Sequence, residues 1–272
     1  MRAIGEAGYV LSKSELCTLA GLAGCKKLIG IDKSYPVNEE DIIKELEKVK
    51  SGLVAKKYFQ KLDEGYGIDK NISFLIKACC NPTAIVRFIE CKEGSRRNRY
   101  YYFHKDVIVE LDQDILNEDT CILTPIASVS KAFSNMEEFF HIEQMIGKLD
   151  SRMFDNRFSI KHDALMHLMN HEGDMREPIA DSVFLEAGMD GFLYQDLIFA
   201  LNQSGESYSM LLIKLGNPKT YYSSDIYAGR SFLWKITGSR EHKDYDEISP
   251  GTREDMLIVA EQFIDIIKNV MA

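Results

Sequence analysis

Two histidines four residues apart, His167 and His171, have the spacing in this sequence that best fits metal chemistry. Imidazoles at that interval share one face of a helix and can hold a divalent metal together, and other ligand types lie nearby at His162, Asp163 and Glu172. A helical H-E-x-x-H zinc site places its glutamate directly after the first histidine, whereas Glu172 follows the second. We therefore interpret the pair as exposed polar histidines and predict neither a metal site nor a cofactor.

The sequence lacks the short motifs of nucleotide binding and nucleophilic catalysis. It contains no G-x-S-x-G elbow, no Walker loop and no G-x-G-x-x-G, because Gly65-Tyr66-Gly67 is not followed by the later glycine. Carboxylates are numerous, but they are scattered over predicted solvated helix faces. We predict a non-enzymatic protein with no catalytic residues. Because catalytic groups can converge only in the fold, a hydrolase or transferase without a motif stays as a third alternative.

The cysteines show no pattern of metal binding or redox catalysis. None forms a C-x-x-C pair, and a bridge between the adjacent Cys79 and Cys80 would close a strained ring. Cys79 continues the apolar helical face of Ile72 and Leu75, so we predict that this pair is reduced and at least partly buried. The six cysteines are Cys17, Cys25, Cys79, Cys80, Cys91 and Cys121.

Length and charge limit the classes of protein to consider. The 272 residues are enough for one large domain or two lobes, and the formal net charge is −9. An acidic surface does not neutralise phosphates, so nucleic acid is not the expected partner. The start, Met1 to Leu11, lacks the apolar core of a signal peptide, and no run has the length of a membrane span. We predict a cytoplasmic protein, in which the cysteines stay reduced.

Two stretches of the chain carry the same order of predicted elements. A helix over 69–80 leads into an apolar strand over 84–91, β-rich runs over 99–111 and a helix opening at Thr124-Pro125. A helix over 191–202 leads likewise into a strand over 208–215, β-rich runs over 220–236 and a helix opening at Ser249-Pro250. The starts at 69 and 191 and the prolines at 125 and 250 are 122 and 125 residues apart. This near-constant offset indicates an internal duplication.

The duplication predicts an α+β fold with two pseudo-symmetric lobes, each an antiparallel sheet of three or more strands flanked by helices. The first lobe should span residues 1–141 and the second 142–272, with helices over 163–170 and 177–187 before the repeated unit and a charged connector over 142–157. In the last helix, Phe263, Ile266 and Ile267 mark an apolar face that favours core packing.

The N-terminal part has the punctuation of a winged-helix-like unit. Ser12 and Glu15 form a capping box before a first helix, Asn38 caps a second helix, and short stretches within 53–68 can pair as a small wing before the helix at Asp69. The second helix carries five carboxylates, which would repel DNA phosphates. A structural or protein-binding unit is therefore the favoured interpretation over a DNA-binding one.

Two surface features are candidates for partner recognition, because arginine and aromatic side chains often anchor interfaces. A basic hairpin tip carries Arg96, Arg97 and Arg99 on an otherwise acidic chain, and the equivalent β-rich part of the second half carries four aromatics beside Lys219 and Lys235. Alternate aromatics that pack inward are the competing interpretation. The predicted partner-binding residues are Arg96, Arg97, Arg99, Tyr221, Tyr222, Phe232 and Trp234.

The arrangement of two lobes resembles the EspG-type chaperones of type VII secretion and their relatives in Gram-positive bacteria. The segments that carry this resemblance are Leu11-Ser12-Lys13-Ser14-Glu15-Leu16, the stretch Leu22 to Leu28, and Cys121-Ile122-Leu123-Thr124-Pro125. The resemblance implies a chaperone with no catalytic residues that binds a secreted substrate at the tip of a helical hairpin. An acidic, lysine-rich chain with cysteines looks more like a Firmicutes protein, for which WXG-type or LXG-type helical substrates are the expected clients.

We therefore predict a cytosolic binding protein, an EspG-like secretion chaperone. The alternative from another class is a winged-helix transcription regulator with a ligand-sensing C-terminal part. The identity of the client and the oligomeric state stay open.

Overall fold

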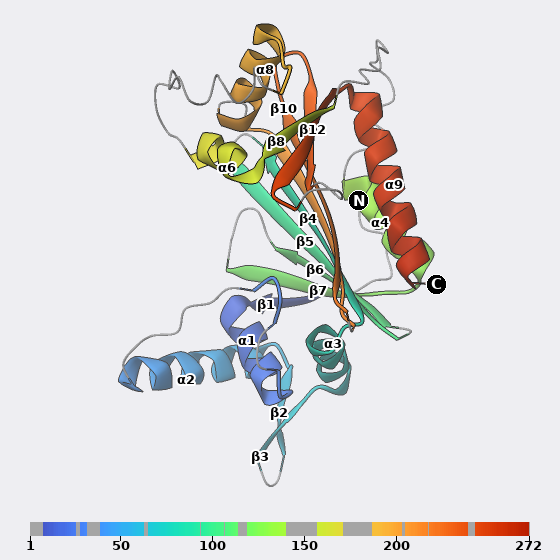
Figure 1. The fold of residues 1–272 in the computed structure, drawn as a ribbon. Helices are drawn as coiled ribbons and strands as arrows, with labels where there is room; N and C mark the ends of the chain where they lie inside the picture. The colour runs from blue at the N-terminus through green and yellow to red at the C-terminus, as the bar shows by residue number, and fades with distance from the viewer. Residues whose placement is uncertain are drawn as a thin grey trace. The chain divides into compact units, whose positions relative to one another are not determined.

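The computed structural model describes residues 8–25, 28–31, 39–62, 65–92, 94–105, 107–113, 119–139, 157–170, 187–202, 205–216, 218–238 and 243–271 (Figure 1). Contacts divide the chain into two compact units. Unit 1 consists of residues 1–86, 97–132 and 213–220, and unit 2 consists of residues 87–96, 133–212 and 221–272. Each unit therefore draws on several separate stretches of sequence. The predicted division into lobes 1–141 and 142–272 stays a prediction.

The structure is α+β with antiparallel strands, as the sequence predicted, but it has one large sheet where a separate sheet was expected in each lobe. Hydrogen bonds connect ten strands in the order β1-β7-β6-β5-β4-β9-β10-β11-β12-β8, and β2 pairs with β3 in a separate hairpin. The strands are β1 (Tyr9–Ser12), β2 (Phe59–Leu62), β3 (Gly65–Ile68), β4 (Ala84–Lys92), β5 (Ser95–His104), β6 (Val107–Gln113), β7 (Thr120–Ile126), β8 (Phe158–Lys161), β9 (Ser207–Lys214), β10 (Thr220–Ala228), β11 (Leu233–Gly238) and β12 (Tyr245–Gly251). The helices within the described residues are α1 (Lys13–Leu22), α2 (Glu39–Ala55), α3 (Lys70–Cys80), α4 (Val129–Phe139), α6 (His162–Asn170), α8 (Gly191–Asn202) and α9 (Arg253–Met271).

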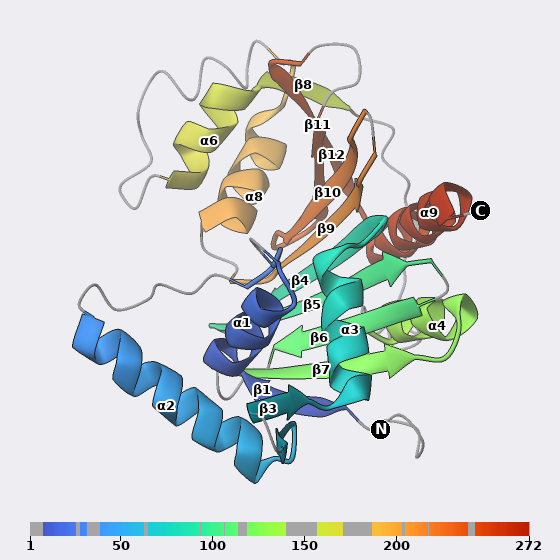
Figure 2. The same ribbon diagram turned by 90° about the horizontal axis from the view of Figure 1, so that it is seen from below.

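In unit 1, α1 and α3 cover one face of the strands β5, β6 and β7 (Figure 2). Side chains alternate along a strand, so Tyr100 and Tyr102 of β5 enter this core while Arg99 and Tyr101 project from the opposite face. Cys79 of α3 is buried in the same core, which confirms the predicted burial, and desolvation raises the pKa of its thiol well above the usual value.

The predicted capping box at the start of α1 is confirmed. The Ser12 hydroxyl accepts a hydrogen bond from the Glu15 backbone N–H at 3.1 Å, and the Glu15 carboxylate accepts one from the Ser12 backbone N–H at 2.7 Å. Lys56, just beyond α2, donates to the same carboxylate at 2.6 Å. This contact fastens the end of α2 to the start of α1.

A hairpin forms where the sequence predicted a small wing. Strands β2 and β3 pair antiparallel, and Phe59 stacks on Tyr66 with 6.0 Å between ring centroids. The interpretation of this region as a winged-helix unit stays a prediction.

The predicted helix over 177–187 and the connector over 142–157 fall outside the described residues, apart from Ala187 and Arg157.

In unit 2, α6 and α8 lie on one face of the sheet and α9 lies on the other (Figure 2). The core under α6 and α8 includes Leu165, Leu197, Trp234 and Ile248. On the other side, Phe263 of α9 is buried and meets Phe88 of β4 edge to face, with 6.1 Å between ring centroids. The helix predictions over 163–170 and 191–202 agree with α6 and α8.

The predicted starts of the two closing helices are wrong. Pro125 lies in β7 opposite Val109, and Pro250 lies in β12 opposite Trp234. Proline cannot donate to a strand ladder, but it is tolerated at strand positions whose N–H is not needed. The Thr-Pro and Ser-Pro pairs therefore end the last strand of each half.

Capping residues a few positions later begin these helices. The Ser128 hydroxyl accepts a hydrogen bond from the Lys131 backbone N–H at 3.1 Å before α4. Before α9, the Asp255 carboxylate accepts from the Thr252 backbone N–H at 2.6 Å and Thr252 Oγ1 accepts from the Asp255 N–H at 3.4 Å. The Thr-x-x-Asp pattern was present in the sequence, and it marks the true N-terminus of α9.

Candidate partner-binding groove

A groove with a volume of about 730 Å³ opens in unit 2 between the sheet and α9. The sheet contributes residues from three neighbouring strands, and α9 contributes residues three or four positions apart, which places them on one side of the helix. The groove is lined by Arg157, by Tyr221, Tyr222, Ser223 and Ser224 of β10, by Lys235, Thr237 and Gly238 of β11, by Glu247, Ile248 and Ser249 of β12, and by Val259, Gln262, Phe263 and Ile266 of α9.

The strand register explains why this lining is mostly polar. Lys235 lies opposite Ser249 and Thr237 lies opposite Glu247, so these polar residues share the face that α9 covers. The residues that alternate with them in β11, Trp234 and Ile236, point into the core on the other face. The sheet thus separates an apolar core from a groove rich in hydroxyl groups.

Ser224 is the most informative residue of the groove. Its side chain is 5% exposed, and its hydroxyl has no hydrogen-bond partner among the residues that the structure describes. A buried hydroxyl without a partner costs about 1–3 kcal/mol. A polar group of a bound molecule would satisfy this hydroxyl, so the floor of the groove favours an occupant that carries hydrogen-bonding groups.

The structure brings two of the four predicted aromatic residues into the groove. Tyr221 is 59% exposed at its rim, and Tyr222 is half-buried in its wall. Lys235, which the sequence analysis placed beside them, also lines it. The neighbouring groups from β12 and α9 were not identified from sequence, because only the tertiary fold brings those elements against β10.

Trp234 and Phe232 do not belong to this surface. Trp234 is completely buried, and its indole N–H donates to the Asp196 carboxylate of α8 at 2.8 Å. Phe232 is half-buried and packs edge to face between Phe192 and Trp234, at 6.0 and 6.3 Å between ring centroids. A side chain with no exposed area cannot contact a partner, so the assignment of Trp234 as a partner-binding residue is wrong. The inward-packing alternative holds for it.

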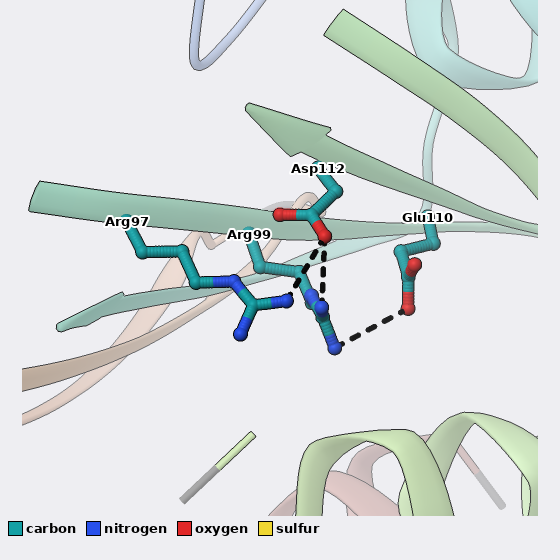
Figure 3. Close-up of polar contacts among 4 residues, drawn as sticks. All are labelled: Arg97, Arg99, Glu110 and Asp112. Carbon is teal, nitrogen blue, oxygen red and sulfur yellow. Dashed lines mark hydrogen bonds and ion pairs between the residues drawn. The ribbon is translucent and has the colours of Figure 1, made fainter. Parts of the chain in front are cut away.

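The predicted basic tip is a strand whose arginines differ in environment. Arg96 is exposed, whereas Arg99 is buried. Arg97 and Arg99 both donate to Asp112 Oδ2, at 3.2 and 2.8 Å, and Arg99 also lies 3.8 Å from Glu110 (Figure 3). Desolvation opposes the charge of Arg99, but the neighbouring Tyr101, Glu110 and Asp112 raise its pKa above the usual value. Arg99 is therefore part of an internal ion cluster and is not available at the surface.

The groove has the features of a binding site for a polypeptide segment. It combines apolar area from Val259, Phe263 and Ile266 with hydroxyl groups and charges of both signs.

Among the described residues no group of three or more His, Cys, Asp and Glu side chains could hold a metal ion, and His171 lies outside them. Within the same residues, no helix combines the length and the apolar character needed to cross a bilayer.

One acidic side chain in unit 2 makes stability depend on pH. Burial raises the pKa of the Asp225 carboxyl, aided by the nearby Asp246 and opposed by a hydrogen bond to Ser209 and by the charge of Arg87. Above its usual pKa of about 4, the folded chain therefore binds more protons at this site than the unfolded chain, so this contribution to stability falls as pH rises.

We expect Asp225→Asn to be at least as stable as the parent at pH 7, with an advantage that shrinks as pH is lowered to about 4. Asparagine removes the buried charge and keeps an oxygen that can accept from Ser209. Urea unfolding between pH 4 and 8 measures the difference. A variant that is less stable by the same amount at every pH would contradict the expectation.

No protein-family model and no curated protein matches this sequence. Among solved structures, the fold is similar to that of the Mycobacterium tuberculosis type VII secretion system chaperone EspG5, determined in complex with a PE25-PPE41 dimer. The TM-score is 0.62 with 9% sequence identity, and the similarity covers 95% of this chain and 96% of that chain. At this identity the likeness is one of fold, and it extends over nearly the whole length of both chains.

Proposed function

We propose that this chain is a cytoplasmic, non-enzymatic chaperone that binds a helical secreted substrate of a type VII secretion system, of the WXG or LXG type. The observation that carries the proposal is the likeness in fold to EspG5 over 95% of the chain. A likeness confined to one domain would leave room for a different activity elsewhere, whereas this one extends over nearly the whole chain. The groove supplies the mixed apolar and polar surface that the tip of an amphipathic helical hairpin requires.

The order of elements supports an internal duplication into two pseudo-symmetric lobes. The connectivity β1-β7-β6-β5-β4 in the first half has the same form as β8-β12-β11-β10-β9 in the second. A short strand followed at once by a helix begins each series, as β1 with α1 and β8 with α6. A helix then precedes four consecutive strands in each half, as α3 and α8 do, and α4 or α9 closes the series.

This correspondence favours the second half as the client site. By order and register, the pair Glu110 and Thr124 in the first half corresponds to Lys235 and Ser249 in the second. In the first half this face holds the ion cluster of Arg99, Glu110 and Asp112, whose side chains are all buried. In the second half the equivalent face lines a groove of about 730 Å³. One face is filled by its own side chains, and the other has space for a partner.

Truncation of Tyr221 tests the proposal. The chain should form a complex when it is co-expressed with a small helical secreted protein encoded beside it, and Tyr221→Ala should weaken that complex about thirtyfold, as for a hot-spot loss of about 2 kcal/mol. Phe192→Ala is the matched control, because Phe192 is 64% exposed on α8, outside the groove, compared with 59% for Tyr221.

Two further variants separate the parts of the proposed surface. Ser224→Ala removes the buried hydroxyl with the loss of a single heavy atom and should weaken the complex if the client bonds to it. An Arg96→Ala, Arg97→Ala pair tests the first-half hairpin, which we keep as a proposed electrostatic contact. Equal affinity for all folded variants would place the site elsewhere, and failure to bind any such neighbour would count against the chaperone function.

A further inference from the structure

Helix α2 of unit 1 has an apolar stripe that the core does not use. Its inner side buries Val49 and Leu53 in the unit 1 core. A second set of apolar side chains is exposed, with Ile43 at 51%, Leu46 at 47% and Val54 at 41%. Together with Lys50 these residues follow the three- and four-residue spacing of one helix face. The helix is therefore apolar on two sides and covered on only one of them by its own core.

The exposed stripe is extended by the β2–β3 hairpin. The Lys50 ammonium lies 4.3 Å from the centre of the Tyr66 ring, and Tyr66 is itself exposed. This contact holds the Lys50 charge beside the apolar side chains of the stripe. A partner that packs on the stripe consequently meets a fixed positive charge near its middle.

Charges of opposite sign are separated along α2. Acidic residues outnumber Lys44 in its first part, with Glu39, Glu40, Asp41, Glu45 and Glu47, whereas the charged residues from position 48 onward are Lys48 and Lys50. Lys56 and Lys57 follow directly after the helix. This order of signs also suits the helix dipole. The dipole does not account for Ile43, Leu46 and Val54, which remain exposed to solvent.

We propose that α2 pairs antiparallel with α2 of a second copy of this chain. An antiparallel pair places the acidic part of one helix against the basic part of the other, which no parallel pair does. A two-fold axis that sets Glu47 of each copy opposite Lys50 of the other also sets Ile43 opposite Val54. In this register, residues of opposite charge face each other and apolar residues of the stripe face each other.

The expected association is weak. A helix of 17 residues is about 25 Å long. Its stripe buries well under the roughly 800 Å² per partner of a standard interface, even with Tyr66 included. We therefore expect a dissociation constant between about 10 µM and 1 mM, within the range of transient contacts. Such a dimer forms where the local concentration of the protein is high.

Sedimentation velocity of the full chain over a range of concentrations tests the pairing. The average mass should rise from 31.0 kDa toward twice that value. Glu47→Lys and Lys50→Glu should each weaken self-association at least tenfold, because each homodimer then opposes like charges twice. An equimolar mixture of the two variants should associate again, since every opposed pair in the heterodimer is of opposite sign.

Lys48→Glu is the matched control for this experiment. It makes the same change of charge as Lys50→Glu in the same helix, but position 48 lies off the stripe, so association should persist. Far-UV circular dichroism should show equal helix content in all variants. A parent chain that stays monomeric throughout, or variants that do not associate when mixed, would overturn the proposed pairing. The result does not depend on whether the groove binds a client.

Discussion

Arg99→Met is expected to lower the free energy of unfolding by about 3–5 kcal/mol. Methionine keeps much of the volume of the arginine, but it removes the guanidinium that lies 2.8 Å from Asp112 and 3.8 Å from Glu110. Both carboxylates are buried and would lose a cation in a medium that solvates charge poorly. Equilibrium urea unfolding, monitored by circular dichroism, measures the loss.

A companion variant separates the charge from the packing. Removing the charge of Glu110 together with that of Arg99, as Arg99→Met with Glu110→Gln, should recover a substantial part of the loss, because a neutral set leaves fewer uncompensated ions. Arg96→Ala is the control on the same strand. Since Arg96 is exposed, its truncation should change stability by no more than about 0.5 kcal/mol. A loss below about 1 kcal/mol for Arg99→Met would show that the cluster is solvated in solution.

Trp234→Ala is expected to destabilise unit 2 by about 3–5 kcal/mol. The substitution removes the largest fully buried side chain and takes a hydrogen-bond donor from the buried Asp196. Trp234→Phe should cost less, since it fills most of the space and loses chiefly the bond to Asp196. Thermal unfolding, followed by calorimetry, orders the two variants. Equal melting temperatures for the parent and Trp234→Ala would contradict the burial.

This prediction affects how binding experiments are read. A loss of client binding by Trp234→Ala would report partial unfolding of unit 2, because Trp234 has no exposed area. Tyr221→Ala, at the rim of the groove, is the cleaner probe. It should bind more weakly while its free energy of unfolding stays within about 1 kcal/mol of the parent.

Sequence patterns predicted the elements whose residues repeat with a clear period. The helix predicted over 69–80 is α3 with Asp69 as its cap, and the strand predicted over 208–215 is β9 within one residue. The N-terminal capping box is confirmed because its two hydrogen bonds are local and need no tertiary contact. Local chemistry and hydrophobic period were sufficient in these cases.

The errors concern residues whose role is decided by contacts with other strands and helices. Pro125 and Pro250 suit the first turn of a helix, but each lies in a strand that pairs with the preceding strand, opposite Val109 and Trp234. Arg99 and Trp234 have the composition of an interface, yet each is buried with a carboxylate from another element, Asp112 and Asp196. A single sequence does not show that these partners converge, and the groove depends on the same kind of convergence.

The interleaving of the two units bears on how the protein is made. Unit 1 includes residues 213–220 as well as residues 1–86, so a ribosome has to synthesise about four fifths of the chain before this unit is complete. Until then, unit 1 lacks residues 213–220, and contacts between residues so far apart in the sequence form slowly. A protein that is proposed to bind and shield a secreted substrate would thus itself leave strands of unit 1 incompletely packed during its own synthesis.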